Sequence, residues 1–349
     1  TAVGYEALKV SNVSGDTNAS NTAVGFHAGV ATTTGKANVF IGSQAGDGNT
    51  TGHYNTGVGL GALGGSLEAD SNTAVGYLAL TANTTGTLNT AVGVSALAAN
   101  TTANSNTAIG DIALTTNSTG AANTAVGRNA LGANTTASNN VAVGHGALES
   151  NTEGHSNTAL GHQAAATVTT GDENTAVGHG SMQSMAAGNN GNTAVGTDTM
   201  ADANFDGSYN VAVGYNALLQ AETISGTTAI GNQCLDALTT GDNNTAVGAG
   251  ALGAITTGAD NTAVGWGALA STNHARNLGI GYRALNAQSG SSDNIAIGYD
   301  TLVRQTTGAN GNLAIGNYAG RAVVSSASTS QLIAIGQSVA DNGSAVLAG

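Results

Sequence analysis

Three histidines follow one another at intervals of 17 residues: His145, His162 and His179. If residues 17 apart lie one above the next, the imidazoles form a row that is a candidate stripe for binding a metal or for titrating together near about pH 6. No carboxylate shares their position in these repeats, and metal ligands must converge on one point. The pattern favours histidines stacked along a surface, and we expect no metal and no cofactor.

Acidic residues with a possible catalytic role fall in segments that the pattern places in turns, namely Asp172, Glu173, Asp242 and Asp260. Glycoside hydrolysis needs two carboxylates held about 5–9.5 Å apart, one of them shielded from water. The sequence shows no Ser/His/Asp constellation, phosphate-binding loop or zinc-ligand spacing. We therefore expect that the chain is not an enzyme. A polysaccharide-degrading solenoid remains the last alternative, because neighbouring coils can bring two carboxylates together.

Seven of the twelve aromatic residues share one position of the repeat. One interpretation is that they cover a bend and stack between neighbouring coils. The other is a surface stripe that contacts a carbohydrate or a receptor. The residues of this aromatic column are Tyr5, Phe26, Tyr77, Tyr215, Trp266, Tyr282 and Tyr299.

The element that positions all these residues is a repeat typified by "NTAVGYLAL" at 72–80, which recurs about every 17 residues. This length suits one coil of a β-solenoid and is too short for a pair of helices. We predict an all-β parallel solenoid of about 20 coils, with residues 1–349 as a single repetitive domain and irregular end repeats at 1–24 and 317–349. The repeat glycines are residues 4, 25, 42, 59, 76, 93, 110, 127, 144, 161, 178, 196, 214, 231, 248, 265, 281, 298, 316 and 336.

Each position of the repeat forms a column, named here by its commonest residue and counted from the glycine. The Asn, Thr, Ala and Val columns lie four, three, two and one residues before it, and the Leu column lies four after it. Side chains alternate along a strand, so Thr and Val share one face while Asn, Ala and Gly share the other. We expect Val and Leu to form the core. The opposite face should pack against another wall of the coil or against identical chains, and we favour identical chains.

Three columns carry further expectations. Asn should stand at a corner in the left-handed conformation and stack into an amide ladder, with a row of ligand-binding amides as the alternative. The "TTG" runs should form an outer turn where glycine supplies unusual dihedral angles. Cys234 replaces a small alanine and should be a core residue. In the last four repeats the Thr column turns aliphatic, which suggests drier packing: Leu278, Ile295, Leu313 and Ile333.

Composition excludes several classes of protein. Charged residues make up 8% of the chain, against about 25% in ordinary globular domains. A net charge of −13 disfavours binding to nucleic acid or to an anionic membrane surface, and no segment approaches 18 consecutive apolar residues. Thr1 already lies within a repeat, so we expect the chain to be part of something longer.

The phrases "NTAVGYLAL", "NTAVGRNAL" at 123–131 and "NIAIGYDTL" at 294–302 resemble the repeats of trimeric autotransporter adhesin heads. They also resemble "NTAVGYxAL" repeats of phage tail fibres and bacterial surface proteins. The resemblance covers all twenty repeats and implies a parallel β-roll, three associated chains, and exposure outside a cell or on a virion. The period of 17 is longer than that of the adhesin heads.

The sequence thus predicts an extracellular structural or adhesive fibre that attaches to a surface or host. Its expected partners are copies of itself, in a homotrimer or filament, with a host receptor or surface glycan as a further candidate. We expect no nucleic acid partner and no membrane insertion in this segment. An ice-binding solenoid is the first alternative, although Thr would then share its face with core valines.

Overall fold

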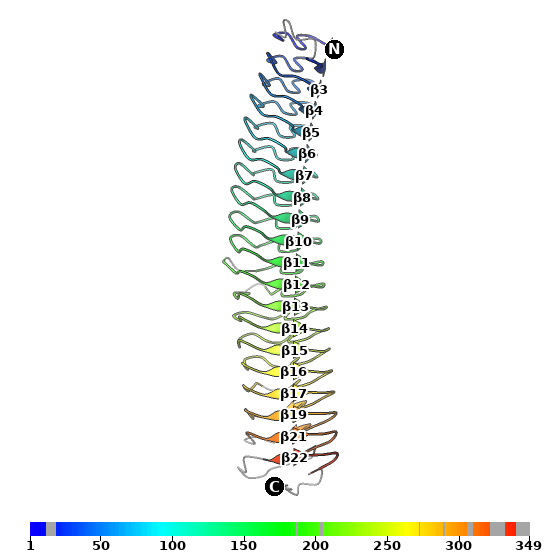
Figure 1. The fold of residues 1–349 in the computed structure, drawn as a ribbon, viewed down its shortest axis with the longest axis vertical. Helices are drawn as coiled ribbons and strands as arrows, with labels where there is room; N and C mark the ends of the chain where they lie inside the picture. Colours follow the sequence, from blue (N-terminus) through cyan, green and yellow to red (C-terminus); the bar gives the residue numbers. More distant parts are fainter. Residues whose placement is uncertain are drawn as a thin grey trace. The chain divides into compact units, whose positions relative to one another are not determined.

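The chain folds as a parallel β-solenoid with one short strand per coil, as the repeat predicts (Figure 1). The computed structural model describes residues 1–11, 19–185, 188–202, 205–271, 273–288, 290–305, 310–321 and 332–339. These residues belong to two compact units, Thr1–Glu173 and Asn174–Gly349, built from the same coil. Within the described ranges there is no helix, and thus none long and apolar enough to cross a membrane. Of the irregular ends predicted at 1–24 and 317–349, residues 12–18, 322–331 and 340–349 lie outside these ranges.

Ten described strands of the first unit and ten of the second belong to the repeat, and two more pair separately. The first unit contains β1 (Ala2–Val3), β2 (Thr22–Val24), β3 (Val39–Ile41), β4 (Thr56–Val58), β5 (Thr73–Val75), β6 (Thr90–Val92), β7 (Thr107–Ile109), β8 (Thr124–Val126), β9 (Val141–Val143) and β10 (Thr158–Leu160). The second contains β11 (Thr175–Val177), β12 (Thr193–Val195), β13 (Val211–Val213), β14 (Thr228–Ile230), β15 (Thr245–Val247), β16 (Thr262–Val264), β17 (Leu278–Ile280), β18 (Ala287–Gln288), β19 (Ile295–Ile297), β20 (Arg304–Gln305), β21 (Leu313–Ile315) and β22 (Ile333–Ile335).

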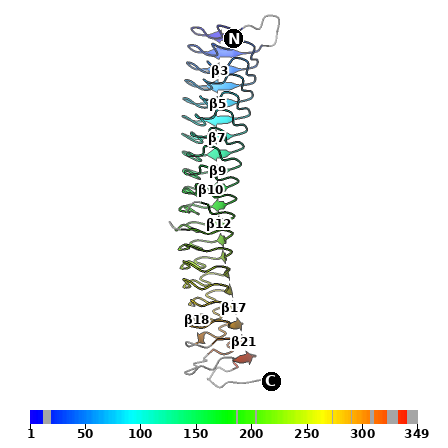
Figure 2. The same ribbon diagram turned by 90° about the vertical axis from the view of Figure 1, so that its left-hand side faces the viewer.

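Within each unit, successive strands pair in parallel and in register, so that every column of the repeat is a column in space (Figure 2). β5 pairs with β6 through Ala74 opposite Ala91, and β15 pairs with β16 through Ala246 opposite Ala263. Hydrogen bonds between coils continue beyond the strands, as where the Leu80 N–H donates to the Ala96 carbonyl at 2.9 Å. The coil is therefore tied to its neighbours along its turns as well.

The interior of the coil holds the Asn, Ala and Leu columns. Asn72, Ala74 and Leu80 have no exposed surface. The Val column, predicted as core, instead faces outward, with Val75 36% and Ile109 40% exposed. The physical reason is that leucine fills the space beside the Ala column, as where a Cβ on Gly57 would lie 3.5 Å from Leu63 Cδ1, so this face takes alanine and asparagine whose amide is hydrogen-bonded. The Asn and Ala face therefore packs within its own coil, and the prediction that it packs against identical chains is wrong.

The repeat glycine is required by the conformation of its backbone and by the close approach of the next coil. Gly76 has φ of +139°, a region that only glycine occupies readily. A Cβ built on it would collide with the carbonyl oxygen of Gly93 in the next coil. Both constraints recur at the glycine of each neighbouring coil, which explains why this residue is kept.

Left-handed residues stand beside the asparagine and not at it. Leu88, directly before Asn89, has φ of +60°, and Ser71, directly before Asn72, has φ of +59°. Leu80 of the Leu column is also left-handed, with φ of +52°. The glycine of "TTG" at Gly86 is buried and has no positive φ, so the expectation of an outer turn that needs unusual dihedral angles is wrong there.

Candidate interaction surface

The outward face of the strands is a sheet of Thr and Val side chains that repeats in every coil. In β5 to β8 the Thr column presents four successive threonines in register, each beside a valine or isoleucine. Neither column contains a charged residue in any of the twenty repeats. We call this surface the Thr/Val face. It is partly exposed, uncharged and regular, and it is the most extended candidate for contact with a partner.

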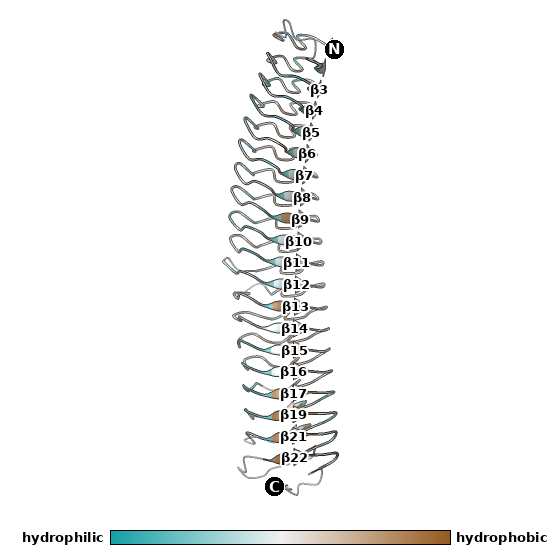
Figure 3. Cartoon of the chain, viewed as in Figure 1, coloured by the Kyte–Doolittle hydropathy of each residue, from teal (hydrophilic) through white to brown (hydrophobic). Residues whose placement is uncertain are grey.

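The Thr/Val face becomes more aliphatic towards the end of the second unit (Figure 3). There β17, β19, β21 and β22 replace threonine with leucine or isoleucine. Their side chains face outward, with Ile295 38% and Ile333 43% exposed. The sequence predicted drier packing around these residues, and the interior of the coil does not provide it.

The aromatic column is exposed, and its rings stack where neighbouring coils both carry one. Tyr5 and Phe26 stack with ring centroids 5.5 Å apart. Trp266, Tyr282 and Tyr299 continue the pattern, with centroids 5.1 Å and 4.9 Å apart. Loss of water in this stack, and then the charge of Asp300, raise the pKa of Tyr299. Tyr77 and Tyr215 have no aromatic residue in the column positions before or after them. A role in binding stays a prediction for the whole column.

The histidine stripe is divided between the two units. In the first, His145 and His162 stack with centroids 5.2 Å apart. Arg128 Nη1 lies 3.2 Å from His145 Nε2, and because guanidinium can only donate, that nitrogen accepts. A cation at His145 Nε2 would have to displace Arg128. In the second unit, His179 lies 3.6 Å from Asp198.

No group of three or more His, Cys, Asp or Glu side chains suited to a metal ion occurs in the described ranges. The stripe therefore gains no support as a metal site from its surroundings.

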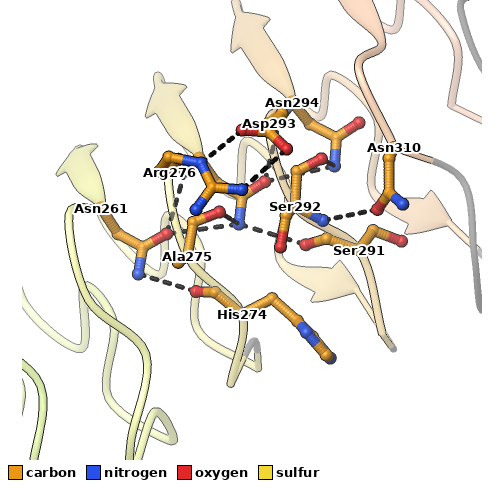
Figure 4. Close-up of polar contacts among 10 residues, drawn as sticks. Asn261, His274, Ala275, Arg276, Ser291, Ser292, Asp293, Asn294 and Asn310 are labelled. Carbon is orange, nitrogen blue, oxygen red and sulfur yellow. Dashed lines mark hydrogen bonds and ion pairs between the residues drawn. The ribbon is translucent and has the colours of Figure 1, made fainter.

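The Asn column forms the predicted amide ladder, which is buried and internally bonded. The Asn89 N–H donates to Asn72 Oδ1 at 2.9 Å, and Asn89 Nδ2 donates to the Ala103 carbonyl at 2.8 Å. In the second unit the ladder continues through Asn261 and Asn294 (Figure 4). Because these amides are already hydrogen-bonded inside the coil, they are not available as a row of ligand-binding groups.

A second ladder, which the sequence analysis missed, lies on the surface six residues before the repeat glycine. Asp172 Oδ1 accepts the His155 N–H at 2.6 Å, and Asp242 Oδ1 accepts the Ser225 N–H at 2.8 Å. Asn310 does the same for Ser292 (Figure 4). The signal was the recurrence of Asp, Asn, Ser and His at this position. Two of the acidic residues considered for catalysis thus secure the backbone between coils.

Of the other acidic residues considered, Glu173 and Asp260 are exposed in turns. An exposed ion pair joins Arg276 to Asp293 through two contacts of 2.7 and 3.1 Å, and it lowers the pKa of that carboxyl. Cys234 is buried, as predicted, and loss of water raises the pKa of its thiol to about 12.

No protein-family model matches the chain, and neither does any curated protein at a significant level. The resemblance of its repeats to adhesin heads and tail fibres therefore stays a prediction.

Proposed function

We propose that this protein is a structural and adhesive fibre that works outside the cell, at a cell surface or on a virion, and whose copies associate in threes through the Thr/Val face. The observation that carries the proposal is that face: partly exposed, free of charge and continuous within each unit. The resemblance of the repeats to trimeric adhesin heads supports the number three. The proposal assigns the chain no catalytic role.

The size of the face supports an interaction. Three residues at ~3.3 Å by ten coils at ~4.8 Å give roughly 500 Å² per unit. Threonine hydroxyls take part of this area, and the largest apolar patches on monomers, which are often functional, measure about 300–600 Å². Exposed apolar surface of this extent gains free energy when a partner covers it.

A copy of the same chain is the partner that fits best. Only a partner with the same rise per coil keeps its side chains in register with Thr and Val over many coils. The chain carries a net charge of −13, so copies repel one another over most of their surface. The uncharged Thr/Val face is where this repulsion opposes contact least.

The first experiment is the absolute mass of the purified chain by light scattering coupled to size exclusion. We expect a mass three times 33.6 kDa. The variant Val75→Lys/Val92→Lys/Ile109→Lys should run as a single chain with an unchanged circular dichroism spectrum, because these side chains already face outward. A matched control places three lysines elsewhere on the same coils: Ser71→Lys/Leu88→Lys/Ser105→Lys. A monomeric wild type, or equal effects of the two variants, would contradict association through this face.

A second candidate, ice binding, is favoured by one observation. A buried valine would have hidden the threonine on the same face, yet Thr and Val both face outward. Four successive threonines, Thr73, Thr90, Thr107 and Thr124, form a regular rank. Thermal hysteresis that persists in a monomeric sample and disappears in Thr90→Lys/Thr107→Lys would support it. The aliphatic substitutions of β17 to β22 interrupt such a rank and favour the fibre.

A further inference from the structure

The aromatic stack of the second unit ends abruptly at Trp266. Tyr282 covers one face of the indole, with the rings 13° from parallel. The preceding coil carries Ala249 in the same column, so no ring covers the other face. Trp266 is 55% exposed. One indole face is therefore directed along the column over a small residue.

The surroundings of Ala249 are open and polar. Beside it stands Gly250, where a Cβ would meet no atom within 4 Å. One coil earlier, the corresponding two positions are occupied by Asn232 and Gln233, both exposed. The level of Ala249 thus lies between the coil of Trp266 on one side and the coil that carries Asn232 and Gln233 on the other.

The distance between the coil of Asn232 and the coil of Trp266 leaves an interval that would accommodate one additional ring at the level of Ala249. Two coil rises separate the levels of Asn232 and Trp266, about 9.6 Å at ~4.8 Å per coil. A ring at the Ala249 level would lie one rise from the indole, and the stack itself uses separations of 5.1 and 4.9 Å. Asn232 and Gln233 stand one coil away on its opposite side, and the amide of each can both donate and accept hydrogen bonds.

We propose that this interval between Trp266 and Asn232 binds a neutral pyranose ring at the end of a glycan. The face of an indole is electron-rich and attracts the polarised C–H groups on one side of a sugar ring. Its hydroxyl groups then pair with the amides, an arrangement of apolar contact and a few polar groups that is usual for ligand sites. The inference rests on the proposed adhesive function and names the chemistry that it recognises.

The absence of charge around the interval and the negative charge of the chain favour a neutral sugar. None of the four positions that border the interval, Asn232, Gln233, Ala249 and Gly250, carries a charge. The net charge of −13 disfavours the approach of sialic or uronic acids. Tyr77 offers a contrast in the same column, because Leu60 and Val94 fill the positions on both sides of it. It is 50% exposed and serves as a matched aromatic outside the site.

Trp266 is the only tryptophan of the chain, so its fluorescence reports on this site alone. The probes are the methyl glycosides of glucose, galactose, mannose, N-acetylglucosamine and N-acetylgalactosamine, titrated to about 10 mM, where a millimolar Kd approaches saturation. We expect a saturable change in emission with at least one of them. The variant Ala249→Tyr fills the interval by extending the stack, and tyrosine already occupies this column in five other coils. It should weaken binding at least about tenfold, whereas Tyr77→Ala should change the Kd less than about twofold.

Three results would overturn the inference. The first two are no response of Trp266 to any of the five glycosides and an unchanged Kd in Ala249→Tyr. The third is tighter binding of the methyl glycoside of sialic acid, titrated in the same way. Self-association is measured separately by light scattering. If the protein is a trimer and binds none of the five sugars, only the glycan site is refuted. If it is a monomer and binds one of them, only the association is refuted.

Discussion

Phe40 and Gly46 share one volume inside a single coil. Phe40 replaces the alanine of the Ala column and Gly46 replaces the leucine of the Leu column. A Cβ built on Gly46 would collide with the Phe40 ring, and one on Gly29 in the preceding coil would lie 2.9 Å from it. Two glycines in place of leucine thus make room for one buried phenylalanine. The Phe40 ring thus takes the space that two leucine side chains of the ordinary repeat would occupy.

This complementarity predicts a coupled response to mutation. Gly46→Leu should destabilise the chain by about 1–3 kcal/mol or more, because it overpacks against the ring. Its φ of +59° is not the obstacle, since leucines of this column adopt the same conformation. Phe40→Ala should cost about 3–5 kcal/mol through the cavity that it leaves. Urea unfolding followed by circular dichroism measures both.

The double variant Phe40→Ala/Gly46→Leu restores the ordinary repeat at these two positions. It should be clearly more stable than the sum of the single effects predicts, with a coupling of at least about 1 kcal/mol. Additive single effects would show that the two side chains do not compete for the same space.

The coil itself could be predicted from the sequence, because a 17-residue period and strand alternation are properties of the chain alone. Which face turns inward could not. Hydrophobicity ranks Val75 above Ala74 and Asn72, yet the narrow interior selects for size and for hydrogen bonds that neighbouring coils supply. For the same reason, the packing of Phe40 against Gly46 could not be predicted, although the sequence shows that both residues depart from the repeat.

Among the candidate surface residues, the sequence placed the aromatic column correctly relative to the strand but could not show which rings lose a neighbour. The contrast between Trp266 and Tyr77 depends on the residue one coil away, at positions 249, 60 and 94. The left-handed backbone was predicted at the asparagine, whereas the structure has it at the residue directly before the asparagine. The amide of Asn89 is needed inside the coil, so Leu88 makes the turn.

The amide ladder departs from asparagine at Thr227 and Leu332, and it predicts a stabilising mutation at the first of these. Thr227 accepts the Asn244 N–H through Oγ1 at 3.4 Å, longer than the 2.9 Å of the usual asparagine contact. Thr227→Asn should raise the free energy of unfolding by about 1 kcal/mol, the net value of a typical hydrogen bond. Thr228→Asn, one residue later on the outward face, is the control and should change stability by less than about 0.5 kcal/mol. The mutation in the opposite sense, Asn89→Leu, should cost more than about 2 kcal/mol because it leaves buried groups unpaired.

The repeat glycine should tolerate no side chain. Gly93→Ala combines φ of +140° with a collision against the carbonyl of Gly110, so we expect a loss of at least about 3 kcal/mol. Gly253→Ala is the matched control, since a Cβ there would come no closer than 3.2 Å to any atom. It should be neutral within about 1 kcal/mol or slightly stabilising, because alanine restricts the unfolded chain. Equal losses in the two variants, measured by urea unfolding, would refute this role of the repeat glycine.

Cys234 predicts how stability depends on alkaline pH. Burial raises the pKa of its thiol to about 12 from an ordinary value of 9.0, so the folded chain keeps the proton over a range in which the unfolded chain loses it. The contribution is fully present below pH 9.0 and is lost as the pH rises towards 12. Between neutral pH and about pH 10.5, the wild type should lose about 2 kcal/mol more than Cys234→Ala. Tyrosines and lysines titrate in both proteins and cancel in this comparison. The same burial should leave the native thiol unreactive toward aromatic disulfides until urea unfolds the chain. Rapid labelling under native conditions, or parallel pH profiles of the two proteins, would mean that the thiol is reached by water and that its pKa is not raised.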